Sequence, residues 1–192
     1  MALTKQRYTF EDWLALPDDG KRYELLNGEL VEMPPPTANH ALLVRVLSRW
    51  LDRADEAGYG IALTAPVAVI LDATIRRQNA PEPDVFFVRH SQEHSIRANA
   101  VEGVPDLVIA ILSPGNRRDD LPGGTKRDLY ERCAVPHYWI VDQEARTVTQ
   151  YQHAGGGYGA PLLLRAGDTL AFPVAPEITL PVADLFRDLR PW

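Results

Sequence analysis

Residues 81–88 read Pro81-Glu82-Pro83-Asp84-Val85-Phe86-Phe87-Val88 and place one carboxylate directly before a short, continuous apolar run. Such a run is typical of a strand that is covered on both faces. A second run of this kind, Leu107–Leu112, follows and contains Ala110. Because a sheet holds its residues rigidly, Asp84 is well placed to bind a metal ion. The two runs therefore predict an interior sheet and a candidate site beside it.

Length and composition limit the fold. With 192 residues, of which 45% are hydrophobic and 24% charged, the chain is expected to form a single domain, residues 1–192. No apolar run approaches the roughly 20 residues that span a bilayer, and the N-terminus lacks the apolar region of a signal peptide. We therefore expect a cytoplasmic protein with no membrane partner. Cys133 is the only cysteine, which excludes an internal disulfide and a cysteine-cluster zinc site.

The net charge of -6 argues against a surface that coats nucleic acid non-specifically, because phosphate binding needs clustered cations. Local arginine clusters nevertheless flank the candidate site, at Arg76-Arg77, at Arg117-Arg118 and at Arg127. They are candidates for contact with phosphate. The alternative is that they are solvated loop charges.

The remaining sequence predicts helices and strands around these two runs. Asn27-Gly28 favours a two-residue turn, and hence a β-hairpin from residues 23–26 and 29–33. Apolar residues at helical spacing predict a long helix over residues 40–57, capped by Thr37 or Asn39. A capped short helix is expected after Thr9. Further expected elements are strands at 61–64, 67–71, 138–142 and 147–151, a loop over 113–124, a helix over 125–133 capped by Thr125, and a short helix near 182–186.

This order predicts an α/β (α+β) protein. A central mixed β-sheet flanked by helices would carry an N-terminal β-hairpin and a β-rich C-terminal extension over residues 152–192. The candidate chemistry fits that frame. Hydrolysis of a phosphodiester needs a metal, carboxylates to hold it and a cation, which Asp84, a residue at position 110 and Lys126 could supply across adjacent elements. Taken singly, an aspartate after proline is more often a turn residue, and a lysine at a helix start is more often solvated.

The ordered motifs resemble the Uma2 family of inferred endonucleases, formerly a domain of unknown function. They are residues 22–33, His40, Pro83-Asp84, residues 105–114, residues 126–130 and residues 138–142, so the resemblance covers about residues 9–151. It implies the PD-(D/E)XK, restriction-endonuclease-like fold, with a four-stranded mixed sheet. It also implies Mg²⁺-dependent (or Mn²⁺-dependent) cleavage of DNA, and a homodimer is expected by analogy.

Carried over by position, the resemblance implies that Asp84 binds the metal and that Lys126 is the lysine of the site, supplied by a helix. Glu24 and His40 match recurring positions near the site. Glu24 could add a metal or water contact, and His40 could act on a phosphate or a proton. Their alternatives are a charge on a strand surface and a polar residue at a helix start. The backbone carbonyl of Ile111 is a further candidate ligand.

Ala110 departs from the family pattern, which has glutamate there as the second metal ligand. Three explanations are open: a natural pseudo-nuclease, a deliberate inactivating substitution, or compensation by another acid. Glu82 is the best compensator, because strand residues two apart face the same side. Asp106 is expected to be a turn residue, and Asp119, Asp120 and Asp128 are expected to be loop and helix-start charges. The alternative to an endonuclease is an inactive nuclease-fold protein that binds nucleic acid or a protein partner.

Overall fold

The computed structural model describes residues 7–71, 78–113 and 117–191. Its N-terminal part consists of α1 (Phe10–Leu14) and a hairpin of β1 (Arg22–Leu26) and β2 (Glu29–Met33). Thr9 and Asp12 close α1 with a reciprocal capping box. The hairpin turns at Asn27 and Gly28, whose φ angles of 50° and 76° are those that a two-residue turn requires. Both predictions are confirmed.

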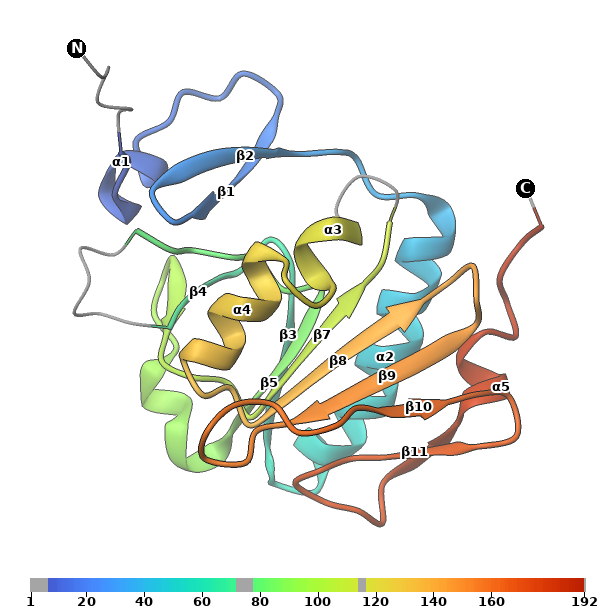
Figure 1. Cartoon of the computed structure of the whole chain (residues 1–192). Coiled ribbons are helices and arrows are strands. Elements are labelled where there is room, and N and C mark those ends of the chain that lie inside the picture. Colours follow the sequence, from blue (N-terminus) through green and yellow to red (C-terminus); the bar gives the residue numbers. More distant parts are fainter. Residues whose placement is uncertain (1–6, 72–77, 114–116, 192) are drawn as a thin grey trace.

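A central mixed sheet of six strands lies in the described part of the chain (Figure 1). Its order is β10 (Leu162–Leu164), β9 (Thr147–Gln152), β8 (His137–Asp142), β7 (Leu107–Ile111), β5 (Val85–Arg89) and β3 (Gly60–Thr64). Neighbours are antiparallel except β7 and β8, which are parallel. The mixed sheet was predicted, but it has two strands more than the four that the family resemblance implied.

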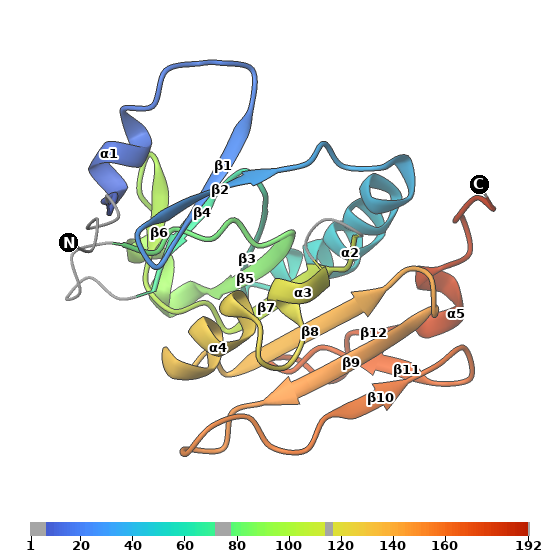
Figure 2. The same cartoon turned by 45° about the horizontal axis from the view of Figure 1, so that its top comes forward.

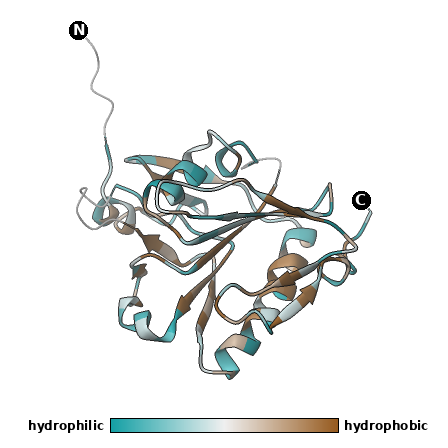
Figure 3. Cartoon of the chain, turned by 60° about the horizontal axis from the view of Figure 1, so that its bottom comes forward, coloured by the Kyte–Doolittle hydropathy of each residue, from teal (hydrophilic) through white to brown (hydrophobic). Residues whose placement is uncertain are grey.

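Helices cover both faces of this sheet (Figures 1 and 2). One face packs against α2 (Ala38–Glu56) and the C-terminal elements β11 (Thr169–Ala171), β12 (Thr179–Pro181) and α5 (Val182–Leu185). The other face packs against α4 (Thr125–Arg132). Since strand residues alternate between faces, odd-numbered residues of β5 and β7 contact the α2 side and even-numbered residues the α4 side. Figure 3 shows the strands as the hydrophobic interior between more polar helices.

The segment between β3 and β7 contains one predicted strand and two further elements. The predicted strand is β4 (Ala68–Ile70), which forms a small parallel pair with β6 (Ala100–Glu102) beneath the hairpin. A 3-10 helix, η1 (His90–Ser95), follows β5. Strand β6 was not predicted, since three residues are too few for a recognisable pattern.

Two local predictions were wrong. The expected loop over residues 113–124 contains a short helix, α3 (Arg117–Asp120), although residues 114–116 of that loop lie outside the described ranges. The cap of α4 is Gly124, without a side-chain hydrogen bond, and Thr125 is the first helical residue. Gly124 lies so close to α3 that a Cβ there would meet the Arg118 carbonyl oxygen at 2.2 Å. Close packing of α3 on α4, which no local pattern encodes, explains both differences.

Candidate active site

The site begins where β5 and β7 meet. Val85 pairs with Ile109 in antiparallel register, so Asp84, one residue earlier, stands opposite Ala110. Opposite residues of an antiparallel pair project to the same face with Cβ atoms about 5 Å apart. That face is the α4 side, where Ala110 is buried beside Tyr138 and Tyr130. A glutamate at position 110 would therefore project next to Asp84, and the alanine leaves that position without a carboxylate.

Asp84 is held by two hydrogen bonds. Its Oδ1 lies 2.9 Å from Nε2 of His40, which stands in the first turn of α2. Its Oδ2 accepts a bond of 2.6 Å from the backbone N–H of Ile111. Thr37 fixes His40 in turn, because its hydroxyl accepts the His40 backbone N–H and caps α2. The carboxylate is thus oriented from both sides while remaining 16% exposed.

Asp84 and His40 line a pocket of about 40 Å³ together with Glu82 and Arg22, and Pro34–Pro36 form one wall of it. That volume is room for roughly three water molecules. Glu82 therefore lines the same pocket as Asp84, although β5 begins only at Val85, so the spacing of strand residues is not the reason. Ile111 also lies at the site, but the contact that the structure shows is through its N–H and not through the carbonyl that was suggested as a ligand.

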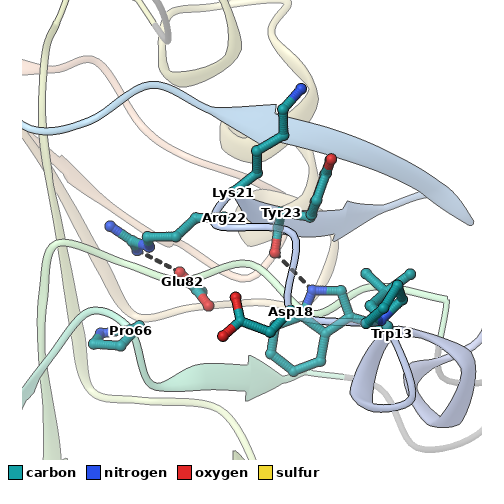
Figure 4. Close-up of a pocket in the computed structure, with 9 residues that line it drawn as sticks. Trp13, Asp18, Lys21, Arg22, Tyr23, Pro66 and Glu82 are labelled. Atoms are coloured by element: carbon teal, nitrogen blue, oxygen red, sulfur yellow. Dashed lines mark hydrogen bonds and ion pairs between the residues drawn. The ribbon is translucent and has the colours of Figure 1, made fainter.

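Glu82 is paired with Arg22 across 2.5 Å (Figure 4). Burial raises the pKa of Glu82 and the neighbouring Glu24 adds to the rise, while Arg22 and Lys126 oppose it. The Arg22 side chain is 44% exposed and also lines a groove of about 310 Å³, with Trp13, Tyr23 and Pro66 beside it. Arg22 and Glu82 thus join the Asp84 pocket to a wider, partly aromatic groove.

Behind this pocket, Glu24 of β1 and Lys126 of α4 form a buried ion pair with an Nζ–Oε1 distance of 2.9 Å. The same Glu24 oxygen accepts the backbone N–H of Glu82 at 2.8 Å. Burial disfavours the charge of Lys126, but Glu24, Asp120 and Asp84 outweigh it and hold the pKa of the ammonium well above its usual value. These three carboxylates therefore favour the charged form of Lys126. A helix does supply the lysine, as expected.

Asp120 belongs to this cluster, and sequence reasoning missed it. It was expected to be a surface charge, yet it is fully buried at the end of α3. Its Oδ1 accepts a hydrogen bond of 3.1 Å from the Tyr138 hydroxyl. Burial raises the pKa of Asp120 to about 6; Lys126 opposes the rise, whereas Asp84 and Glu24 add to it. Asp119, its half-buried neighbour, has the same side chain, so the sequence carried no signal that separates the two.

The arginines that were proposed to contact nucleic acid differ in their exposure and in their partners. Arg117 is exposed and pairs with Asp142 at 2.7 Å, and Arg118 is also exposed. Arg127 lies over the rings of Tyr151 and Tyr158 and pairs with Glu131, which gives it a structural role. Arg76 and Arg77 lie outside the described ranges. Contact of any of them with nucleic acid stays a prediction.

Two other acids have structural partners. Asp106 accepts the backbone N–H of Arg89 at 3.0 Å and pairs with its guanidinium, which fixes the start of β7. Asp128, in the first turn of α4, lies 3.2 Å from the Arg127 guanidinium. Neither contact involves the Asp84 pocket.

The side chains around Asp84 could hold only certain kinds of divalent ion. Within residues 7–71, 78–113 and 117–191, no three acidic, histidine or cysteine side chains lie close enough to form a metal cluster. A zinc-type site therefore does not fit. Magnesium needs only one or two carboxylates, because it keeps several of its waters. Asp84 in a pocket with room for water meets that need, and the buried atoms Glu24 Oε2 and Asp120 Oδ2 have no hydrogen-bond partner. The residues present fit a hydrated magnesium-type ion.

In the described residues no helix is both long and apolar enough to cross a membrane.

A family model and a solved structure are similar to this chain. The Uma2 family model, described as "Putative restriction endonuclease", matches residues 10–183, and thus extends well into the C-terminal region beyond the motifs at 9–151. A crystal structure described as a putative nuclease belonging to DUF820 from Anabaena variabilis ATCC 29413 is similar in fold, with a TM-score of 0.75 and 17% identity over 93% of this chain and 97% of that one. No curated protein matches the chain.

Proposed function

The chain belongs to the Uma2 family, and we propose that it is a magnesium-dependent endonuclease that hydrolyses phosphodiester bonds of DNA. One observation carries the proposal beyond family membership. Four side chains from separate elements, Glu24, His40, Asp84 and Lys126, meet at one end of the central sheet. Burying the Glu24 carboxylate and the Lys126 ammonium costs several kcal/mol per ion, so their retention beside Asp84 supports a functional role.

Asp84 would hold Mg²⁺, or Mn²⁺, together with water and a second acid. When bound, such an ion supplies positive charge that offsets the charge of the phosphate and lowers the pKa of bound water. His40 and the Ile111 N–H fix the Asp84 carboxylate, so its orientation does not depend on the ion. Glu82 lines the same pocket, but its charge is already balanced by Arg22.

Lys126 provides a fixed positive charge beside this pocket. Because its pKa is raised, the ammonium stays protonated and stabilises negative charge on phosphorus and on an attacking hydroxide. Glu24 holds the ammonium in place through the 2.9 Å ion pair. The half-exposed Arg22 is the cation at the mouth of the pocket and is suited to meet a phosphate of the incoming strand.

Ala110 favours a second candidate function. Without the glutamate, the same pocket would bind nucleic acid without cutting it, and that binding would weaken steeply with salt. Salt-sensitive binding of DNA combined with no cleavage would distinguish this protein from an active endonuclease. A homodimer, which would allow both strands to be cut, is part of the proposal and can be checked by sedimentation equilibrium.

The proposed function is tested by incubating the protein with supercoiled plasmid and with single-stranded DNA, with and without Mg²⁺ or Mn²⁺. We expect metal-dependent nicking that is lost in Asp84→Asn and in Lys126→Met, and is retained in Asp52→Asn. Asp52 is an exposed acid of α2 and serves as the matched control. Cleavage that persists in Asp84→Asn at the wild-type rate would show that the nuclease activity comes from elsewhere.

A further inference from the structure

The buried end of α3 presents an acid with one carboxylate oxygen that no hydrogen bond satisfies. Asp120 is fully buried, and its Oδ2 has no hydrogen-bond partner. A buried carboxylate oxygen without a partner costs free energy, so its persistence calls for a ligand, an ion or a function. The nearby ammonium of Lys126 does not satisfy it, because that ammonium forms its ion pair with Glu24.

The position of Asp120 relates it to the alanine on β7. Asp120 bonds to the Tyr138 hydroxyl, and Tyr138 packs in the same cluster as Ala110 and Tyr130. In the parallel register of β7 and β8, Tyr138 pairs with Val108 and the next inward residue, Ile140, pairs with Ala110. A glutamate at position 110 would project from the sheet into the layer between β7 and the helices. Asp120 lies on α3 and approaches the same layer from the opposite side. Side chains at both positions, 110 and 120, would lie between β7 and the two helices α3 and α4.

The charges of this layer do not balance. Glu24, Asp84 and Asp120 are three carboxylates that influence one another, and Lys126 is the ammonium among them. Glu82 is different, because Arg22 neutralises it locally. Because a hydrated magnesium-type ion needs only one or two carboxylates, Asp84 and one further acid of this layer would be sufficient to hold it.

We propose that Asp120 supplies the second carboxylate for the divalent ion, in place of the glutamate missing at position 110. This inference rests on the proposed nuclease function, since it concerns the metal of that site. It selects one of the three explanations for Ala110: an acid from a neighbouring helix compensates for the one lost from the strand. It also assigns a role to α3, which positions Asp120 inward and Asp119 toward the surface.

The test measures Mn²⁺ binding by titration calorimetry, with Mg²⁺ as competitor, at pH 8. Variants are Asp120→Asn, the neighbouring control Asp119→Asn, Glu82→Gln, Ala110→Glu and the double variant Asp120→Asn with Ala110→Glu. Far-UV circular dichroism verifies that each variant is folded. We expect Asp120→Asn to weaken Mn²⁺ binding at least about tenfold, Asp119→Asn to change it less than twofold, and the added Glu to restore binding in the double variant.

The outcomes separate this inference from the function on which it rests. Wild-type affinity in Asp120→Asn, or a loss confined to Glu82→Gln, would refute the role of Asp120 and leave a metal-dependent nuclease standing. Binding by Ala110→Glu but not by the wild type would show that no acid compensates, which also refutes it. If neither the wild type nor Ala110→Glu binds Mn²⁺, the metal site itself is refuted, and the proposed function fails with it.

Discussion

Replacing Asp120 with asparagine is expected to stabilise the metal-free protein at alkaline pH. Burial raises the pKa of Asp120 from 3.8 to about 6, so between these values the folded state binds a proton that the unfolded state has released. Stability from this group therefore rises as the pH falls and is lost as the pH rises through 6. At about 1.4 kcal/mol per pH unit, the ionised Asp120 costs the fold about 3 kcal/mol at pH 8.

Asparagine removes that cost and keeps an oxygen that accepts the Tyr138 hydroxyl. The gain should be at most about 3 kcal/mol at pH 8 and about half of that at pH 5, where much of the native Asp120 is already protonated. Urea unfolding in EDTA at both pH values measures it, with Asp119→Asn as the matched control. A loss of stability at pH 8, or a gain that is equal at both pH values, would refute the assignment of Asp120 as a destabilising buried charge. A buried charge that lowers the free energy of unfolding is an example of the trade-off between stability and activity.

Three further predictions concern the site and the sheet beside it. Glu24→Gln leaves the Lys126 ammonium buried without its partner, so the free energy of unfolding should fall by about 3–5 kcal/mol in urea titrations, and an unchanged value would contradict the buried pair. His40→Ala removes a bond that orients Asp84, and plasmid nicking should slow by roughly tenfold or more while the melting temperature changes little; equal rates would show that His40 has no positioning role. Gly60→Ala would bring a Cβ to 2.2 Å from the Val88 carbonyl oxygen at a φ of 152°, and should lower the melting temperature by several degrees, whereas Gly58→Ala, which meets no atom within 4 Å, should cost less.

Local patterns in the sequence were sufficient for elements whose physical cause is itself local. Asn27-Gly28 identified the hairpin turn, because both residues tolerate positive φ. Helical spacing identified α2, although the helix begins at Ala38, two residues earlier than predicted, and Thr37 is the cap of the two candidates Thr37 and Asn39. Apolar runs identified β5, β7 and β8 as interior strands. In each case the neighbouring residues contain the information that the structure uses.

Tertiary packing decided what the sequence could not. The burial of Asp120 depends on the short helix α3, whose packing against α4 has no sequence pattern of its own. Asp84 and Lys126 were expected to share a site, but the family resemblance was needed to single them out, because 41 residues, including β5, β6 and β7, separate them in the chain. The exposure of Arg117 and the packing of Arg127 between tyrosine rings likewise follow from contacts between distant segments.

We propose that Asp84 belongs to a metal-dependent nuclease site that Ala110 weakens but does not abolish. The most direct measurement compares the rate of plasmid nicking by the wild type and by Ala110→Glu at saturating Mg²⁺. The structure predicts slow, metal-dependent nicking by the wild type and an increase of at least about tenfold in Ala110→Glu, because the added carboxylate projects next to Asp84. Absence of cleavage and of metal binding in both proteins would contradict the claim.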